Sequence, residues 1–240
     1  MPSPRAAASP PAVRDAALRL VRALGRPPGT LALDVPCGTG LLLHDLTALG
    51  FVARGGDRDP GPARAAGLAA DALDLEAPLP YPDGRFGLVT CVEGIEHVEA
   101  QRPLLAELAR VLAPGGALVL TTPNVLGRPS RTSLARHGYA RFFRPTPPGA
   151  PTPFEHEHVH PVDAVRLDHL LRAVGLVPQT WDGDHGAGPR PSLRHRLLFR
   201  LDAARLRRHN PRADLLAHPA IYHSRVLAVS ARKPDGPPGA

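Results

Sequence analysis

Apolar residues follow two alternating patterns along the first half of the chain. Stretches with apolar residues three or four positions apart predict amphipathic helices, and short apolar runs bounded by glycine or proline predict buried strands. Helices are predicted at residues 12–24, 39–49, 60–68 and 103–112, and strands at residues 31–35, 51–55, 69–73, 86–92 and 117–122. Strands separated by helices imply a doubly wound, Rossmann-like α/β sheet that is mostly parallel, with ligands bound beyond the carboxyl ends of the strands.

The second half of the chain is less regular but continues this alternation. It predicts a helix at residues 162–174 and strands at residues 176–181 and 225–231. A chain of 240 residues with 43% apolar residues fits one globular domain, which we place at residues 12–233. Residues 1–11 and 234–240 are proline-rich and lack apolar periodicity, and we interpret them as disordered tails.

Composition narrows the functional classes. The net charge of +7 comes almost wholly from arginine, since Lys233 is the only lysine, and the abundance of alanine, proline, glycine and arginine is typical of GC-rich coding. Because only 4% of the residues are aromatic, few platforms exist for stacking bases, and nucleic acid is not the expected substrate. No apolar stretch approaches the roughly 18 residues of a membrane span, so we expect a cytoplasmic protein. Two cysteines, Cys37 and Cys91, predict buried free thiols and no disulfide framework.

Residues 31–40, LALDVPCGTG, combine a buried strand with a glycine turn and the start of a helix. Gly38 and Gly40 allow the backbone to approach a ligand closely, and the helix presents unpaired N–H groups above the strand. This pattern predicts a nucleotide-binding loop. A dinucleotide fingerprint needs a third glycine three positions after Gly40, where this chain has Leu43. The missing glycine argues against an NAD-dependent reductase.

Acidic residues follow the next strands, at places where an adenosyl group could be bound. Asp57 comes after the second strand, and its carboxylate could accept hydrogen bonds from both ribose hydroxyls. Asp74 and Leu75 follow the third strand. This pair suits an adenine ring, because the carboxylate can accept from the exocyclic amine while the leucine packs on the ring face. Val92 and Glu93 follow the fourth strand, which lies beside the first in this topology.

These residues, in this order, resemble the class I S-adenosylmethionine-dependent methyltransferases over residues 31–233. LALDVPCGTG resembles the first motif of that family, GGDRDP its acidic ribose-binding turn, DLEAPLPYPDGRFGLV its adenine segment and fourth strand, and ARVLAPGGALVLTTPN its fifth-strand motif. CVEGIEHV and LDHLLRAVGL are most similar to the branch that contains ubiquinone-type O-methyltransferases and related bacterial small-molecule and glycan methyltransferases. Two positions depart from the family pattern, since Pro36 stands where glycine is usual and Gly87 where aspartate is common.

The resemblance implies a seven-stranded sheet whose last strand is antiparallel, and S-adenosyl-L-methionine as cofactor, with S-adenosyl-L-homocysteine as product. It implies methyl transfer to a hydroxyl, with an amine or carbon as alternatives, of a small-molecule or glycan acceptor. The residues assigned to the cofactor are Asp34, Cys37, Gly38, Gly40, Asp57, Arg58, Asp74, Leu75, Val92 and Glu93. A non-catalytic S-adenosylmethionine-binding partner or sensor module is the alternative function, and the oligomeric state stays open.

Methyl transfer from a sulfonium requires mainly that a nucleophile is held in line with the C–S bond. A hydroxyl nucleophile also needs a base, and the candidates are Glu93, Glu96, His97, Glu155, His156, His158 and His160. We assign the catalytic roles to His97 and Glu93, because the pKa of an imidazole lies near the working pH. The alternative for His97 is a capping or packing role at the start of the next helix.

A run of alternating histidines follows a long insertion. In an extended segment His156, His158 and His160 would lie on one side, as a metal could require. We predict no metal site, because no distant fourth ligand can be identified and the resembling family uses this segment as a rim over its substrate pocket. Residues 126–160 are interpreted as a substrate lid, with a proline-rich surface loop as the alternative. The predicted substrate contacts are Arg131, Tyr139, His156 and His158.

Residues 193–208 predict a basic amphipathic helix. Its apolar face would contain Leu193, Leu197, Leu201 and Ala204, with arginines around the other faces. Such a helix could contact an anionic membrane or grip a phosphorylated substrate. We favour the alternative in which the apolar face packs on the domain itself and the arginines are solvated.

Overall fold

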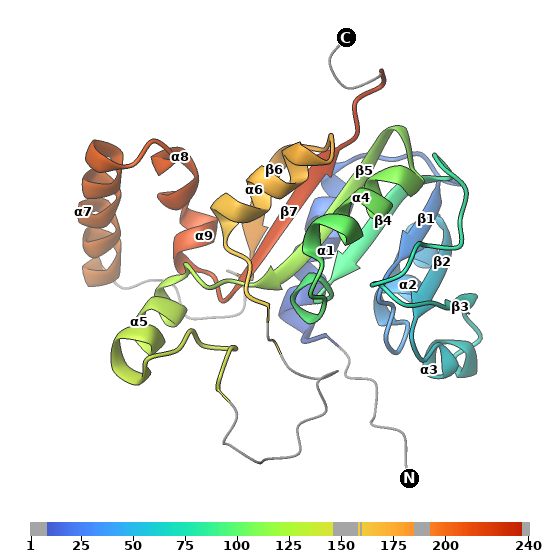
Figure 1. The fold of residues 1–240 in the computed structure, drawn as a ribbon, viewed down its shortest axis with the longest axis horizontal. Helices are drawn as coiled ribbons and strands as arrows, with labels where there is room; N and C mark the ends of the chain where they lie inside the picture. Colours follow the sequence, from blue (N-terminus) through green and yellow to red (C-terminus); the bar gives the residue numbers. More distant parts are fainter. Residues whose placement is uncertain (1–8, 146–157, 159, 185–192, 237–240) are drawn as a thin grey trace.

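Seven strands form one sheet in the order β3-β2-β1-β4-β5-β7-β6, and β7 runs antiparallel to both of its neighbours (Figure 1). The computed structural model describes residues 9–145, 158, 160–184 and 193–236. The strands are β1 (Leu31–Asp34), β2 (Val52–Asp57), β3 (Ala70–Ala72), β4 (Phe86–Val92), β5 (Leu112–Pro123), β6 (Val177–Gly183) and β7 (Val226–Arg232). The pairs among β1 to β5 are parallel, so the predicted doubly wound sheet with an antiparallel last strand is confirmed.

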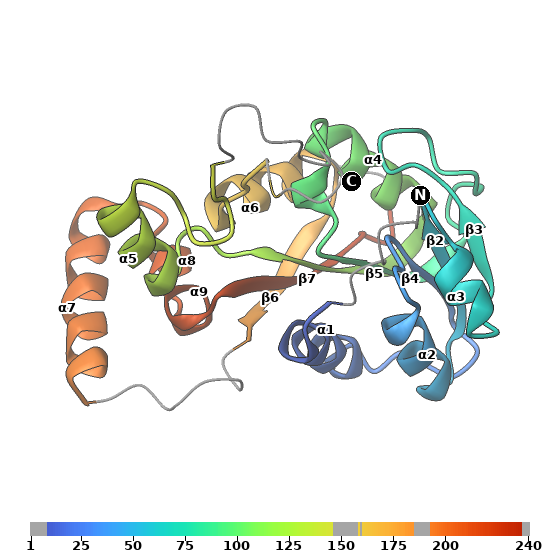
Figure 2. The same ribbon diagram turned by 90° about the horizontal axis from the view of Figure 1, so that it is seen from below.

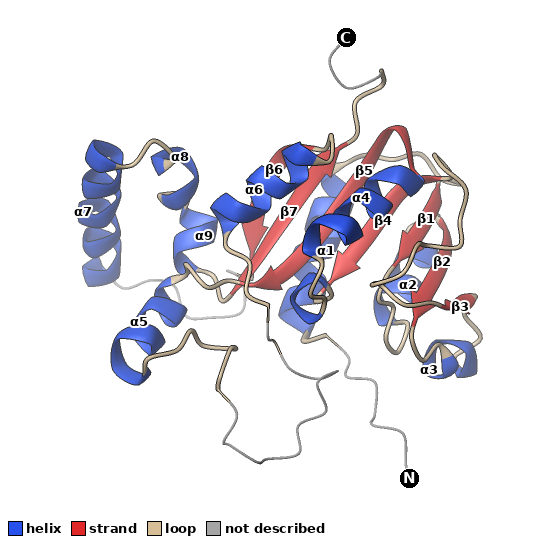
Figure 3. Cartoon of the chain, in the orientation of Figure 1, coloured by secondary structure: helices blue, strands red, loops and turns tan. Residues whose placement is uncertain are grey.

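Helices cover both faces of the sheet, with α1 and α2 on one face and α4 and α6 on the other (Figure 2). Helices α5, α7, α8 and α9 gather at the end of the molecule that lies farthest from β3 (Figure 3). The helices are α1 (Pro11–Ala23), α2 (Leu41–Ala48), α3 (Gly61–Ala65), the 3₁₀ helix η1 (Ile95–His97), α4 (Gln101–Val111), α5 (Arg128–His137), α6 (Ala164–Ala173), α7 (Leu193–His209), α8 (Ala213–Leu216) and α9 (Pro219–His223).

Alternating side chains of the central strands divide the core into two layers. Leu33 and Leu120 belong to the layer beneath α4 and α6, whereas Ala32 and Val119 belong to the layer beneath α1 and α2. Successive side chains of a strand point to opposite faces of the sheet, so each central strand contributes to both layers. All four side chains are fully buried, so packing fixes the carboxyl ends of these strands at one edge of the sheet.

The ends of several elements differ from the predicted ones. β4 has the predicted bounds, but β5 begins at Leu112 and not at residue 117, because Leu112 already pairs with Phe86 of β4. β2 extends to Asp57, so the acidic residue expected after that strand is its last residue. α1 begins at Pro11, inside the segment predicted to be a tail.

The packing face of α7 differs from the predicted one. The Phe199 ring packs against the rings of Tyr222 and His223, with centroids 4.8 and 5.1 Å away, and Ala203, one turn later, is buried. Leu197 and Leu201 are instead 59% and 54% exposed. The prediction that the leucine face packs on the domain is therefore wrong for these two residues, because Phe199 and Ala203 define the face that does.

Two further expectations concern membranes and thiols. Among the described residues, no helix is both long and apolar enough to cross a bilayer. Cys37 and Cys91 are buried free thiols, as predicted. Burial raises the pKa of both thiols, to about 12 for Cys37, so neither is a reactive thiolate near neutral pH.

Candidate functional site

A cavity of about 680 Å³ lies at the carboxyl ends of β1, β2, β4 and β5, beside the start of α1. Pockets of this size hold drug-sized ligands. The predicted cofactor residues that line it are Asp34, Cys37, Gly38, Asp57, Val92 and Glu93. His97 and His158, from the predicted catalytic and substrate sets, line it as well. The structure therefore brings most of the predicted cofactor residues together with two of the predicted chemical groups.

The glycine loop is joined to the end of β2. The Gly38 N–H donates to Asp57 Oδ2 over 2.8 Å, and the Cys37 N–H donates to the Gly56 carbonyl over 2.9 Å. Gly38 and Gly40 have φ of 50° and 82°, a left-handed conformation that glycine adopts without strain. Gly40 does not line the cavity, but it forms the N-cap of α2 and packs closely on Ala63. Its role is to shape the loop.

Asp34 is a buried carboxyl group with one unpartnered oxygen. Its Oδ1 accepts a hydrogen bond from Thr90 Oγ1 over 2.6 Å, while the buried Oδ2 has no hydrogen-bond partner among the described residues. Burial, with a smaller contribution from the Asp57 charge, raises the pKa of Asp34 to about 7. A buried carboxyl group left half-satisfied beside a cavity fits a cationic ligand such as the ammonium or sulfonium group of S-adenosyl-L-methionine.

Glu93 follows β4 in a strained backbone conformation. Its φ is 51°, in the left-handed region that non-glycine residues seldom adopt. Thr121 of β5 holds it there: the Glu93 N–H donates to the Thr121 carbonyl over 3.2 Å, and Thr121 Oγ1 donates to Glu93 Oε1 over 3.1 Å. Burial raises the pKa of Glu93 to about 7, with the Asp184 charge adding to it. A carboxyl group with such a pKa is suited to accept a proton near neutral pH.

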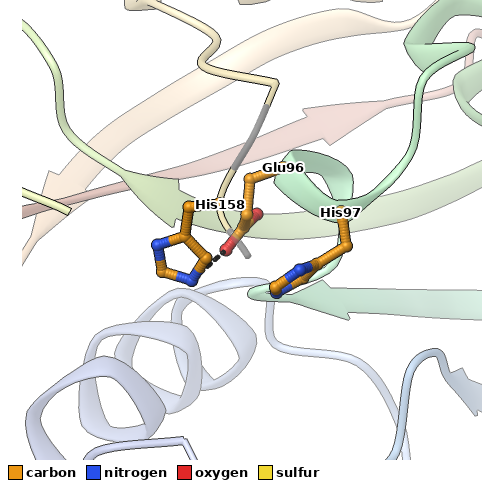
Figure 4. A group of neighbouring side chains, drawn as sticks. All are labelled: Glu96, His97 and His158. Atoms are coloured by element: carbon orange, nitrogen blue, oxygen red, sulfur yellow. Dashed lines mark ion pairs between the residues drawn. The ribbon is translucent and has the colours of Figure 1, made fainter. Parts of the chain in front are cut away.

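Glu96, His97 and His158 form a cluster at the wall of the cavity (Figure 4). Glu96 is fully buried, and Thr122 Oγ1 donates to its Oε2 over 3.1 Å. Its other oxygen, Oε1, faces His158 Nε2 at 3.9 Å, and the two imidazole rings lie 5.0 Å apart. Burial raises the pKa of Glu96 well above its ordinary value, and burial lowers the pKa of His158. One potential ligand atom from each residue lies within 4.8 Å of the others.

Some predicted cofactor residues lie outside the cavity. Arg58 Nη2 contacts both carboxylate oxygens of Asp74 at 3.3 Å, and the Glu76 N–H donates to Asp74 over 3.0 Å. Leu75 packs at the margin of the larger core layer. None of Arg58, Asp74 and Leu75 lines the cavity, so the structure does not bring the predicted adenine-binding pair next to Asp34 and Gly38.

Two of the predicted substrate residues lie elsewhere in the structure. Arg131 Nε donates to the Leu126 carbonyl over 2.7 Å, and its guanidinium lies 5.5 Å from the centroid of the Tyr222 ring. Tyr139 lies beside the His137 ring, 6.0 Å between centroids. Neither lines the cavity, whereas His158 and Phe142 of the same predicted lid do. His156 lies outside the described residues.

Sequence reasoning missed the wall formed by Asp184 and Arg225. Arg225 donates to Asp184 through its backbone N–H and its Nε, both over 2.7 Å, and both residues line the cavity. A signal existed. β7 runs antiparallel to β6, so the end of β6 and the start of β7 meet at one edge of the sheet. An acid after β6 and a base before β7 were therefore candidates for this wall.

Known proteins are similar to this chain in sequence. A family model described as a methyltransferase domain matches residues 10–180. The ubiquinone biosynthesis O-methyltransferase of Burkholderia thailandensis is 28% identical over 170 residues, covering 62% of this chain and 65% of that protein. The protein of the same name from Psychrobacter cryohalolentis is 31% identical over 140 residues, covering 49% and 54%. The chain thus spans less than two thirds of these curated relatives.

Solved structures are similar in fold. The 1,6-didemethyltoxoflavin-N1-methyltransferase of Burkholderia thailandensis, solved with 1,6-didemethyltoxoflavin and S-adenosylhomocysteine, has a TM-score of 0.57 and 19% identity, covering 94% of this chain and 79% of that one. The [4+2]-cyclase SpnF also has a TM-score of 0.57, with 22% identity and coverage of 91% and 81%. Because one neighbour is named a methyltransferase and the other a cyclase, the fold alone does not fix a reaction.

Proposed function

Because this chain belongs to the family of methyltransferase domains, we propose that it transfers a methyl group from S-adenosyl-L-methionine to a hydroxyl oxygen of a small-molecule acceptor. Oxygen is chosen as the accepting atom because the relatives in sequence are named O-methyltransferases. The shape of the cavity determines which acceptor binds, and the family motifs do not.

The unpartnered Asp34 Oδ2 beside the glycine loop is the observation that carries the cofactor assignment. Asp57, Glu93 and Asp184 line the same cavity, and the lining residues Arg225 and Arg14 are paired with Asp184 and Asp45. Such a wall favours a cation and opposes a pyrophosphate, whose negative charges it would repel. A sulfonium cofactor therefore suits the cavity better than a dinucleotide does.

Two residues are assigned to the transfer step. When bound, S-adenosyl-L-methionine supplies a methyl carbon that bonds to the acceptor oxygen while the C–S electron pair stays on the departing sulfur. Glu93 accepts the hydroxyl proton, because its raised pKa and its place in the cavity wall match that task. His97 holds the acceptor oxygen in line for transfer.

The insertion at residues 126–160 supplies the acceptor side of the pocket in this proposal. Phe142 and His158 reach the cavity, and both Phe142 and Phe143 lie near the His158 ring, with centroids 6.4 and 5.7 Å away. An aromatic cluster around one imidazole suits an acceptor that is apolar apart from its hydroxyl. Contacts of His156, Arg131 and Tyr139 with the acceptor stay predictions.

Calorimetry tests the cofactor assignment. The protein is expected to bind S-adenosyl-L-methionine and S-adenosyl-L-homocysteine but not NADH. Asp57→Ala removes the partner of the Gly38 N–H as well as the ribose acceptor, and should weaken binding by about 1.5 to 3 kcal/mol. The control is Asp59→Ala, since Asp59 is exposed on the same turn and does not line the cavity. Failure of the wild type to bind either sulfur cofactor would sink the proposal.

Turnover separates the enzyme from the non-catalytic module. Formation of S-adenosyl-L-homocysteine should appear with acceptors from a panel of phenols, catechols and saccharides, and Glu93→Gln should lower kcat by a larger factor than it lowers cofactor affinity. Cofactor binding without turnover on any hydroxyl acceptor would instead favour the partner or sensor module.

We further propose that α7 contacts an anionic membrane surface. Leu197, Leu201 and Ala204 are exposed and share one helix face, and the exposed Arg200 and Arg205 lie to either side of it. Exposed leucines flanked by arginines suit insertion of the apolar side chains while the guanidinium groups contact lipid phosphates.

Vesicle cosedimentation checks this contact. The protein should bind phosphatidylcholine vesicles that contain phosphatidylserine, less at high salt, and should not bind phosphatidylcholine alone. Changing both Leu197 and Leu201 to Ser should abolish binding. The matched control is Val52→Ser, because Val52 is 57% exposed on β2, away from α7. Binding that is absent, or indifferent to salt, would rule the contact out.

A further inference from the structure

We propose that Glu96, His97 and His158 bind a divalent transition-metal ion of the zinc class, and that this ion holds the acceptor oxygen in the cavity. The use of the ion in catalysis rests on the proposed function, whereas the binding of the ion does not. The inference departs from the sequence, which predicted no metal site because it considered His156, His158 and His160 as the ligand set.

The three side chains converge from separate parts of the chain. Glu96 and His97 belong to η1, just after β4, and His158 comes from the segment that precedes α6. One nitrogen of each imidazole and one carboxylate oxygen lie within 4.8 Å of one another (Figure 4). Donor atoms bound to one tetrahedral zinc ion lie about 3.3 Å apart, given bonds of about 2.0 Å. Binding of the ion therefore requires the donor atoms to approach one another by up to about 1.5 Å, through rotation of the two partly exposed imidazoles.

The buried Glu96 carboxyl group provides an independent indication of a ligand. Thr122 satisfies only Oε2, and Oε1 is buried with no hydrogen-bond partner among the described residues. Oε1 points toward His158 Nε2, at 3.9 Å, where a bridging cation would fit between them. A fully buried carboxyl oxygen without a hydrogen bond is costly, and an ion bound at that point would remove the cost.

The ligand types select the class of ion. Two imidazole nitrogens and one carboxylate are a ligand set of catalytic zinc sites, which keep a further position open for water or substrate. Magnesium prefers an all-oxygen environment with octahedral geometry, and it is disfavoured by two nitrogen ligands. The set therefore favours Zn²⁺, with Co²⁺ as its spectroscopic substitute.

The position of Glu96, His97 and His158 at the cavity would allow the ion to bind the acceptor. His97 and His158 line the same cavity as Asp34 and Gly38, whereas Glu96 lies behind them. The open coordination position therefore faces the cavity, and His97 would hold the acceptor oxygen through the ion when the ion is bound. An acceptor hydroxyl bound there would ionise more readily, because the ion would stabilise the resulting oxyanion, and the proton would pass to Glu93 in the same cavity before the methyl transfer.

Metal titration of the tag-free full-length protein tests the proposal without cofactor or acceptor. Co²⁺ should bind with a stoichiometry of one and give the visible absorption of a four- or five-coordinate site, and Zn²⁺ should displace it. His158→Ala, His97→Ala and Glu96→Gln should each weaken Co²⁺ binding at least tenfold. His169→Ala is the matched control, because His169 is an exposed histidine of α6 and should bind Co²⁺ as the wild type does.

Three results would overturn the proposal: Co²⁺ affinity that is unchanged in His158→Ala, absence of binding by the wild type, or displacement of Co²⁺ by an equal concentration of Mg²⁺. His158 is the decisive position, because its side chain is 24% exposed and its replacement does not empty the core, which thermal melting can verify. S-adenosyl-L-methionine binding is measured in parallel. Cofactor binding without metal binding contradicts only this inference, and metal binding without cofactor binding contradicts only the proposed function.

Discussion

Asp34 and Glu96 are two buried carboxyl groups built in the same way in different regions of the site. A threonine on a neighbouring strand, Thr90 for Asp34 and Thr122 for Glu96, donates to one carboxylate oxygen. The second oxygen of each is buried and has no hydrogen-bond partner among the described residues. Asp34 lies beside the glycine loop, whereas Glu96 lies behind the two histidines.

The difference lies in the surroundings of each carboxyl group. Asp34 lines the cavity together with Gly38 and the carboxyl groups of Asp57 and Glu93, a setting for a cation carried by an organic ligand. Glu96 faces imidazole nitrogens, which are donors for a metal ion. A buried carboxyl group with only one hydrogen-bonded oxygen can thus bind either an organic cation or a metal ion, and the neighbouring side chains determine which of the two binds.

Removing each charge separately should produce the largest effect. Asp34→Asn should weaken S-adenosyl-L-methionine binding by about 30- to 150-fold, or 2 to 3 kcal/mol, because a charged hydrogen-bond acceptor is lost. It should leave Co²⁺ affinity unchanged, and Glu96→Gln should do the reverse. Calorimetry with each ligand checks both. If one substitution weakened both ligands equally, the two regions would not be independent.

The next largest effect should be the pH dependence of the stability of the ligand-free protein. Burial raises the pKa of Asp34 from 3.8 to about 7, so between these values the folded state binds more protons than the unfolded state. The stability contributed by Asp34 is therefore present at low pH and is lost as pH rises toward 7, at about 1.4 kcal/mol per pH unit, which is about 2.5 kcal/mol between pH 5 and pH 7. Asp34→Asn should raise the melting temperature more at pH 8 than at pH 5. An equal gain at both pH values would show that Asp34 is not protonated in the folded state.

Cofactor affinity should also follow the ionisation of Asp34. Because the carboxylate form binds the cation, the affinity for S-adenosyl-L-methionine should fall by up to tenfold, about 1.4 kcal/mol, for each pH unit below 7. Calorimetry from pH 5.5 to 8 measures this slope, and Asp34→Asn is the control that should flatten it. A wild-type slope that matches the variant would assign the pH dependence to another group.

The threonines should give the smallest effects. Thr90→Val removes the hydrogen bond that the Asp34 carboxyl group accepts from Thr90 and should weaken cofactor binding about fivefold, near 1 kcal/mol. Thr122→Val should act comparably on Co²⁺ binding through Glu96. The two valine variants form a matched pair, each a control for the other. Comparable losses of both ligands in one variant would indicate a general change in packing.

The region around Asp34 could be predicted from the sequence because it is local. The strand, the glycine turn and the next helix occupy one continuous segment, and the strand order brings Asp57 beside it. Hydrophobic periodicity sets each of these elements, so their carboxyl ends meet without further information. Such reasoning located the glycine loop at the cavity and the fold together, while the binding of the cofactor to this loop stays a prediction.

The region around Glu96 could not be predicted in the same way. His158 meets Glu96 and His97 only because the chain returns from β5 through a long insertion, and no periodic pattern encodes that path. Local alternation grouped His158 with its histidine neighbours in sequence. Similarly, helical spacing found the leucine stripe of α7 but not the fact that Phe199 packs inward. Spacing defines faces, whereas tertiary contacts decide which face is buried.

The first turn of α1 forms part of the cavity wall, where Val13 and Arg14 lie with the residues just before them. A ligand that fills the cavity therefore also holds the amino-terminal helix in place. By reciprocity, undocking of α1 and release of the ligand share one free-energy difference. A protease that cuts inside α1, between the buried Ala16 and Leu20, would then report cofactor occupancy, since this helical backbone is cleaved only when the helix lifts from the sheet and unwinds.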